Sequence, residues 1–289
     1  MPTQLDLKRR IRSVKNTQQI TRAMKFVAAA RLRRAQEKAV STRPYARALA
    51  RVVHSAAARA PEADHALLER RPEERILLIV VSGERGLCGA FNANVIRRAI
   101  EFLRQRREAK ELEVITLGRK GRDAMRKQPW KIVAEHVDVT SKANFSRAAE
   151  IAYEAMARYE AKEVDAVYIV FNEFKSVMTQ LLTLEKLLPI EPAPADGEST
   201  GSVPVEYLYE QPAAQLFARL LPRYVEAQVY RALAESSASE HAARMTAMDS
   251  ATNNARELID KLTLYMNKVR QAAITKEIIE VVSGAASAG

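Results

Sequence analysis

One glycine-containing turn is the part of the sequence that most resembles a nucleotide-binding site. Gly83, Gly86 and Gly89 follow an apolar run and precede a stretch with helical periodicity. Backbone amides ahead of a helix N-terminus can hold a phosphate, which is how many such turns bind nucleotides. The spacing here, however, is G-x-x-G-x-x-G rather than G-x-G-x-x-G, and no Gly-Lys-Ser/Thr motif follows. We interpret the segment as a tight structural turn, with a ligand site as the alternative.

Side chains that could carry out catalysis are few. Cys88 is the only cysteine and has apolar neighbours, so we expect a small packing residue rather than a nucleophile. The histidines have no metal-ligand spacing, and no pair of carboxylates stands in an apolar context. The sequence therefore offers no catalytic acid and base, and we expect no metal and no cofactor.

The first sixty residues are strongly basic. They contain 15 Lys or Arg against two acids, Asp6 and Glu37, so their net charge is +13 (15 − 2), whereas the whole chain carries +11. A cationic surface confined to one segment indicates an anionic counterpart, which could be nucleic acid, an anionic membrane or acidic loops of a protein. A solvated helix face is the simpler alternative, but such faces usually mix both signs.

A basic coiled coil that binds nucleic acid is the alternative function. Coiled coils that grip DNA place their cations beyond the zipper, whereas the cations between Lys8 and Arg34 alternate with apolar positions. Phe26 and Tyr45 are the only aromatic residues in the first sixty, so no platform for stacked bases accompanies the charge. We therefore do not favour nucleic acid as the anionic counterpart.

Apolar spacing predicts a long helix at each end of the chain, and the two are expected to wind around each other. In the C-terminal part, apolar positions step by four and three residues, which is the seam of a coiled coil: Met245, Met248, Thr252, Ala255, Ile259, Leu262, Met266, Val269 and Ala273. Residues 3–58 also show helical periodicity, at Leu7, Ile11, Val14, Ile20, Met24, Val27, Leu32, Ala35 and Ala39. A helix over 3–58 would be about 84 Å long and would project from a compact domain.

Between the two helices, strands alternate with helices, which predicts an open, Rossmann-like parallel sheet. We expect strands at 76–81, 112–117, 131–134 and 164–171, an antiparallel edge strand at 178–188, and helices at 92–108, 119–127 and 144–160. The predicted domains are an N-terminal coiled-coil helix (1–60), an α/β domain (74–190), a loop segment (191–211) and a C-terminal helix that pairs with 1–60 (212–289). Pro222 predicts a kink or a break in the last of these.

The end of the C-terminal helix is apolar on more than one face, which predicts that a sleeve of other protein surrounds it. The residues are Ile274, Ile278, Ile279, Val281 and Val282. No stretch of 18 apolar residues and no secretory leader is visible, so we expect no membrane span.

Three separated motifs resemble the γ subunit of F-type ATP synthase, the central rotor stalk. They are KRRIRSVKNTQQITRAMK at 8–25, GLCGAFN at 86–92, and the C-terminal run from RQAAIT at 270–275 to VSGAA at 282–286. The resemblance spans essentially the whole chain. It implies an antiparallel coiled coil of the terminal helices inside a hexameric ring of alternating α and β subunits, with the ε subunit and the c ring of Fo as further partners.

The same resemblance implies a function without catalysis. The shaft would couple ion-driven rotation of the c ring to the conformational cycle of the β catalytic sites, or the reverse. It would lie at the cytoplasmic face of the bacterial plasma membrane, reach the membrane only through the c ring, and bind no nucleic acid.

Individual residues match the family's contact motifs. Arg270 and Gln271 correspond to a pair that hydrogen-bonds a loop of β. Met24 and Lys25, with Arg244 facing them from the other helix, correspond to a collar that meets an acidic loop of β.

A further motif falls in the loop segment 191–211. Tyr207, Tyr209 and Glu210 correspond to the family's foot, which contacts the polar loops of the c ring and ε.

Overall fold

The computed structural model describes residues 3–59, 65–140, 143–191 and 213–288. The chain divides into two compact units, one formed by residues 1–29 and 244–289 and the other by residues 30–243. Two long helices, α1 (Gln4–Arg59) and α5 (Ala213–Ala288), contribute to both units.

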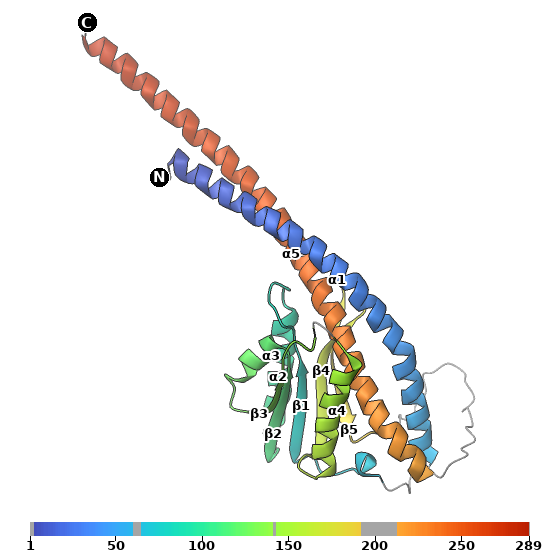
Figure 1. Cartoon of the computed structure of the whole chain (residues 1–289). Helices are drawn as coiled ribbons and strands as arrows, with labels where there is room; N and C mark the ends of the chain where they lie inside the picture. The colour runs from blue at the N-terminus through green and yellow to red at the C-terminus, as the bar shows by residue number, and fades with distance from the viewer. Residues whose placement is uncertain (1–2, 60–64, 141–142, 192–212, 289) are drawn as a thin grey trace. The chain divides into compact units, whose positions relative to one another are not determined.

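The second unit is built on a five-stranded sheet with the order β3-β2-β1-β4-β5 (Figure 1). Its strands are β1 (Arg75–Val81), β2 (Glu111–Leu117), β3 (Lys131–His136), β4 (Ala166–Phe174) and β5 (Gln180–Leu188). The first four run parallel to their neighbours, and β5 pairs antiparallel with β4 at the edge. The predicted open sheet with an antiparallel edge strand is therefore confirmed.

Helices cover both faces of this sheet, which explains the continuous apolar run of β1. Side chains of a strand alternate between faces, so Leu77, Ile79 and Val81 pack with α4 (Phe145–Glu160) and with parts of α1 and α5. The intervening Ile76, Leu78 and Val80 pack with α2 (Phe91–Gln105) and α3 (Arg119–Met125). A short 3-10 helix, η1 (Ala66–Leu68), adds Leu67 to the first core.

The break expected at Pro222 does not occur, because α5 runs through it without interruption. A proline inside a helix removes one backbone hydrogen bond. Phe217, Leu221 and Val225 are buried on either side of Pro222 within the core under α4. Burial of this apolar face compensates for the lost hydrogen bond and keeps the helix continuous.

In the first unit, α1 and α5 pack antiparallel. The hydroxyls of Thr21 and Thr252 lie 2.8 Å apart, and Lys25 Nζ lies 2.6 Å from Asp249 Oδ1, so residue numbers rise on one helix as they fall on the other. Of the predicted C-terminal seam, Met248, Thr252, Ala255 and Ile259 are buried. This confirms the antiparallel coiled coil within the unit.

The N-terminal seam differs from the prediction at two positions. Ile20 and Val27 are 60% and 52% exposed, whereas Thr21 and Ala28 are buried. Steps of four and three residues from Leu7 reach Thr21 and Ala28 and place Ile20 and Val27 one residue outside the seam. The prediction was wrong there because it assigned the apolar side chain to the seam, and the seam takes a threonine and an alanine instead. Ala273, the last predicted seam residue of α5, is also exposed.

Candidate partner-contacting surfaces

The glycine-containing turn after β1 uses its polar groups internally. The backbone N–H of Gly83 donates to Asn92 Oδ1 at 2.8 Å, and the N–H of Gly121 donates to Ser82 Oγ at 2.7 Å. The carboxyl group of Glu240 on α5 packs so closely that a Cβ on Gly83 would lie 2.9 Å from Glu240 Cδ. Nucleotides bind parallel sheets in the crevice beyond the carboxyl ends of the strands. Because the Glu240 side chain occupies the space next to Gly83, just after the carboxyl end of β1, the geometry favours the structural interpretation of the turn.

The side chains that could carry out chemistry are arranged for packing. Cys88 is buried, and Asn92 Nδ2 donates to its Sγ at 3.1 Å, as expected for a packing residue. Within residues 3–59, 65–140, 143–191 and 213–288, no cluster of three or more His, Cys, Asp or Glu could hold a metal ion. In the same residues, no helix is both long and apolar enough to cross a bilayer.

Lys25 forms an ion pair inside the coiled coil, with Asp249 as its partner. Their side chains are 37% and 47% exposed, so the pair lies at the rim of the seam. Met24 is partly buried beside it, and Arg244 is buried. Arg244 precedes Asp249 by five residues, a displacement of about 7.5 Å along the helix axis. The structure thus brings Met24 and Lys25 together and places Asp249, which the sequence analysis missed, opposite them.

Arg270 and Gln271 lie on an exposed stretch of α5. Every residue from Arg270 to Ser283 is exposed, and the Arg270 side chain makes no hydrogen bond or ion pair with any described residue. The apolar tip is equally open, with Ile278 and Ile279 more than half exposed. This end of the helix can therefore offer both a polar pair and an apolar surface to a partner.

Tyr207, Tyr209 and Glu210 lie outside the described residues. The loop segment 191–211 that holds them is described only at Glu191.

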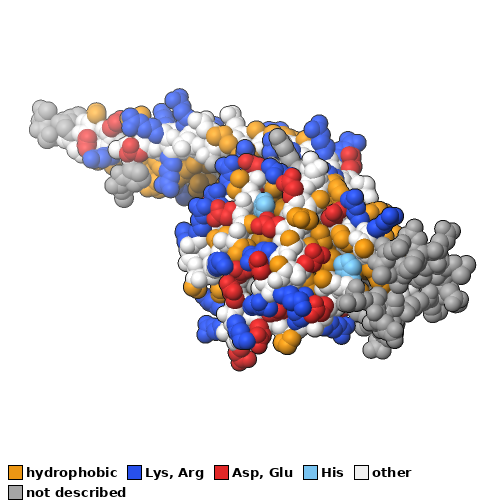
Figure 2. Space-filling model, turned by 60° about the horizontal axis from the view of Figure 1, so that its bottom comes forward, with side chains coloured by type: hydrophobic (Ala, Val, Ile, Leu, Met, Phe, Trp, Pro, Cys, Tyr) orange, Lys and Arg blue, Asp and Glu red, His pale blue; other side chains and the backbone are white. Residues whose placement is uncertain are grey.

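The basic surplus of α1 is largely unpaired. Lys25, Arg33 and Arg43 have acidic partners, and Lys38 donates to the backbone oxygen of Ala143. Ten other cations of α1 have no hydrogen bond or ion pair with any described residue: Lys8, Arg9, Arg10, Arg12, Lys15, Arg22, Arg31, Arg34, Arg47 and Arg51. In contrast, Figure 2 shows one face of the sheet-containing unit on which Lys and Arg are interspersed with Asp and Glu. The unpaired charge of α1 therefore requires an anionic partner outside the chain or exposure to solvent.

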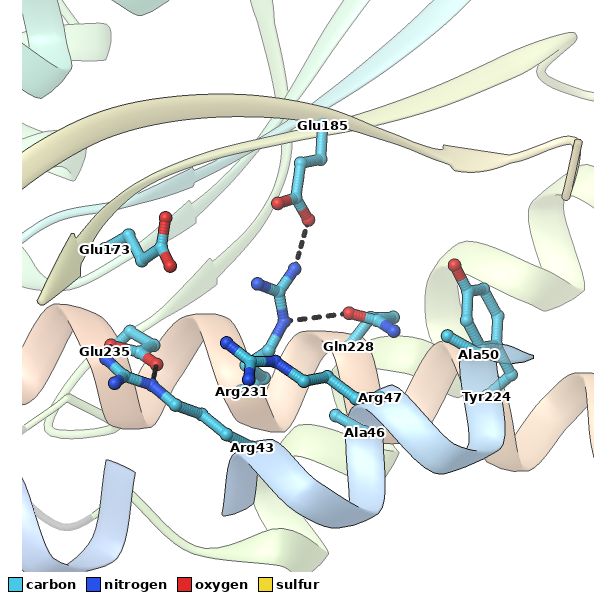
Figure 3. A pocket seen from close by; sticks show the side chains of 10 residues that line it. All are labelled: Arg43, Ala46, Arg47, Ala50, Glu173, Glu185, Tyr224, Gln228, Arg231 and Glu235. Atoms are coloured by element: carbon cyan, nitrogen blue, oxygen red, sulfur yellow. Dashed lines mark hydrogen bonds and ion pairs between the residues drawn. The ribbon is translucent and has the colours of Figure 1, made fainter. Parts of the chain in front are cut away.

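The second unit also contains a polar pocket of about 240 Å³ between α1, α5 and the β4–β5 pair (Figure 3). Its charged lining residues are Arg43, Arg47, Arg231, Glu173, Glu185 and Glu235. Most of them are already paired. Arg43 binds Glu235 through two hydrogen bonds of 2.6 and 2.9 Å, and Arg231 binds Glu185. The bond to Glu235 raises the pKa of Arg43.

The Arg43–Glu235 pair was not predicted from the sequence. A signal was present, because Glu235 interrupts the run of alanine, leucine and serine at 232–239, which is typical of a buried helix. A buried carboxylate in such a run needs a cationic partner.

The chain is similar to known proteins in three comparisons: with a family model, with related sequences and with solved structures. The model of the ATP synthase family matches residues 3–288. The ATP synthase gamma chain of Solibacter usitatus is 53% identical over 100% of both chains, and that of Pelotomaculum thermopropionicum is 46% identical over 99% of both. Among solved structures, a chain of the Euglena gracilis mitochondrial ATP synthase (OSCP/F1/c-ring) has a TM-score of 0.67 at 22% identity, over 97% of this chain and 93% of that one. A chain of the Tetrahymena thermophila central stalk/c-ring structure has a TM-score of 0.61 at 24% identity, over 80% and 99%.

Proposed function

The chain belongs to the family of ATP synthase gamma chains, and we propose from this premise that it is the central rotor shaft of an F1Fo ATP synthase. Its partners would be the hexamer of α and β subunits, the ε subunit and the c ring. It would lie at the cytoplasmic face of the bacterial plasma membrane and reach the membrane only through the c ring. It would carry out no catalytic step itself.

The unpaired charge of α1 is the observation that supports this proposal best. Six of the ten unpaired cations lie between Lys8 and Arg22, on a helix whose other face is already buried against α5. Such a surface is suited to a partner that encloses the coiled coil and is acidic where it meets α1. A hexameric ring around the shaft would satisfy both requirements.

We assign the contacts with β to two places on the coiled coil. Arg270 and Gln271 would hydrogen-bond a loop of β, which their full exposure permits. Met24 and Lys25 would meet an acidic loop of β from the rim of the seam. Arg244 is buried, so its contribution would be to hold this region in place rather than to form a broad contact.

The proposed foot, Tyr207, Tyr209 and Glu210, would contact the c ring and ε. The C-terminal tip from Ile274 onward would turn inside an apolar sleeve, because its exposed isoleucines and valines would otherwise face water.

Rotation would be the means of coupling. An asymmetric shaft can change the affinity of a distant site only if its contacts differ between the states of that site. Rotation would carry Arg270 and Lys25 past one β subunit after another and would supply such a difference. Each β site would then pass in turn through open and closed states. The shaft itself would need stiffness, since a twist absorbed in the shaft does not reach the sites.

Co-expression with α and β subunits tests the proposal. We expect a complex that hydrolyses ATP when this chain is present and that shows little hydrolysis when it is left out. If the purified chain instead fails to associate with α and β and binds DNA tightly at physiological salt, it is a basic nucleic-acid-binding coiled coil and the proposal is wrong.

A further inference from the structure

Three elements of the sheet-containing unit meet at one buried carboxylate. Glu235 of α5 is 1% exposed, and its two oxygens accept hydrogen bonds from Arg43 of α1 at 2.6 and 2.9 Å. One of these oxygens also accepts the backbone N–H of Phe174, the last residue of β4, at 3.0 Å. Arg43 in turn donates to the backbone oxygen of Phe174. The bonds form a closed cycle through α1, α5 and β4. Figure 3 shows the Arg43–Glu235 pair of this cycle.

Two further bonds hold α5 to β4 and to its neighbour β5. Ser239 Oγ, one turn after Glu235, donates to the backbone oxygen of Asn172 at 3.1 Å. Arg231, one turn before Glu235, binds Glu185 of β5, and its Nε donates to Gln228 Oε1 at 2.9 Å. The face of α5 from Arg231 to Ser239 is therefore bonded to β4 and β5 at three successive turns.

This arrangement differs in kind from the apolar packing around it. Apolar contacts are non-directional, and packed helices can slide over one another by small shear movements. Charge-assisted bidentate bonds define both distance and direction. A buried ion pair adds little net stability compared with apolar residues of the same size, but losing one partner leaves the other charge buried and alone. The cycle thus resists displacement of α1 and α5 relative to the sheet more than it stabilises the fold.

We propose that the Arg43–Glu235–Phe174 cycle is a torsional lock that transmits twist between the sheet and both long helices. This inference rests on the proposed rotor function and adds the residues that would carry torque. Without the lock, rotation of the sheet would in part be absorbed as slippage of α1 and α5 over the apolar core. With it, both helices turn together with the sheet.

The test measures torsional stiffness in the assembled complex with α and β. The complex is fixed through the hexamer, and a bead is attached to the sheet-containing unit through Tyr153→Cys, a position 71% exposed, while the native Cys88 is buried and does not compete. Glu235→Gln removes the charge of the lock, and Arg43→Lys keeps the charge but loses the bidentate geometry. Arg47→Gln is the matched control, because Arg47 lies one turn from Arg43, lines the same pocket and has no bonding partner among the described residues.

We expect the variance of the bead angle during pauses to rise about twofold in Glu235→Gln and less in Arg43→Lys, with ATP hydrolysis close to that of the parent. Hydrogen exchange of the Phe174 amide should accelerate about 100-fold in Glu235→Gln. Arg47→Gln should change neither quantity. If the Glu235→Gln chain does not assemble with α and β, the angular variance of the Arg43→Lys complex alone tests the lock.

Equal angular variance in the parent and the lock variants, or equal widening in Arg47→Gln, would overturn the lock. Either result leaves the rotor function standing if the parent bead still turns. If the parent complex neither hydrolyses ATP in the presence of this chain nor turns the bead, the proposed function itself fails.

Discussion

Asp165, the residue before β4, has a buried carboxylate whose ionisation affects the stability of the sheet. It accepts hydrogen bonds from the backbone N–H of Arg75 at 2.9 Å and from the Arg75 guanidinium at 2.7 and 3.1 Å. These bonds hold the pKa of Asp165 below its ordinary value of 3.8, with the Arg75 side chain as the largest cause. Because the folded-state pKa is lowered, the stabilisation is present above about pH 4 and is lost as the pH falls through the folded pKa.

The lowered pKa of Asp165 leads to the first prediction. Asp165→Asn should lower the free energy of unfolding by about 1–3 kcal/mol at neutral pH and should flatten the loss of stability as the pH falls below the ordinary Asp pKa of 3.8. Urea unfolding of the full chain over this pH range measures both effects. An acid dependence as steep as that of the parent would show that Asp165 does not contribute to it.

Lys25 has two roles to separate, one within the coiled coil and one toward a partner. Lys25→Gln and Asp249→Asn break the same ion pair, but only the first removes the cation. Each should destabilise the isolated chain by less than about 1 kcal/mol, because the pair is half-exposed. If Lys25 contacts an acidic loop of β, then Lys25→Gln should reduce ATP-driven ion pumping per ATP hydrolysed more than Asp249→Asn does. Equal pumping in the two variants would show that Lys25 acts only within the coiled coil and not on a partner.

At the scale of elements, the turn from β2 into α3 depends on Gly118. Its φ is +96°, and a Cβ there would lie 2.3 Å from the backbone oxygen of Ser82. Gly118→Ala should therefore destabilise the chain by at least about 3 kcal/mol, measured by thermal unfolding. Gly86→Ala is the control, since its nearest neighbour would be Lys120 Cε at 3.9 Å, and it should shift stability by less than about 1 kcal/mol. Similar effects of the two substitutions would contradict this view of the turn.

The tip of α5 gives the second prediction for an element. Residues 278–283 are exposed, so deletion of residues 278–289 should leave the stability of the coiled coil unchanged. We expect assembly with α and β to weaken by less than about tenfold, because sleeve contacts would be apolar and spread over many residues. Assembly yield and rotation of the truncated complex are the measurements, and complete loss of rotation would refute this role for the tip.

The order of elements could be predicted from the sequence because each has a strong periodicity. The apolar run of β1 and the amphipathic pattern of α2 both indicated their structures, and the apolar positions Val95, Ala99, Phe102 and Leu103 of α2 are buried. The path of α5 through Pro222 could not be predicted, since it depends on tertiary packing around Phe217 and Val225 rather than on local preference.

Over the whole molecule, the charge imbalance was visible in the sequence, but the pairing of individual charges was not. Asp249 and Glu235 are distant in sequence from Lys25 and Arg43, and their meeting depends on the register of two antiparallel helices. That register is set in part by polar seam positions such as Thr21, which an apolar pattern does not detect. The candidate contacts Arg270, Gln271, Met24 and Lys25 came from family resemblance, and they remain predictions.

The proposed function requires that this chain turn as a shaft inside a ring of other subunits. The most direct measurement fixes the α and β hexamer to a surface, attaches a bead through Tyr153→Cys and supplies ATP. A rotor predicts sustained rotation of the bead in one direction, at a rate that follows ATP hydrolysis. A bead that stays still while the same complexes hydrolyse ATP would contradict the account.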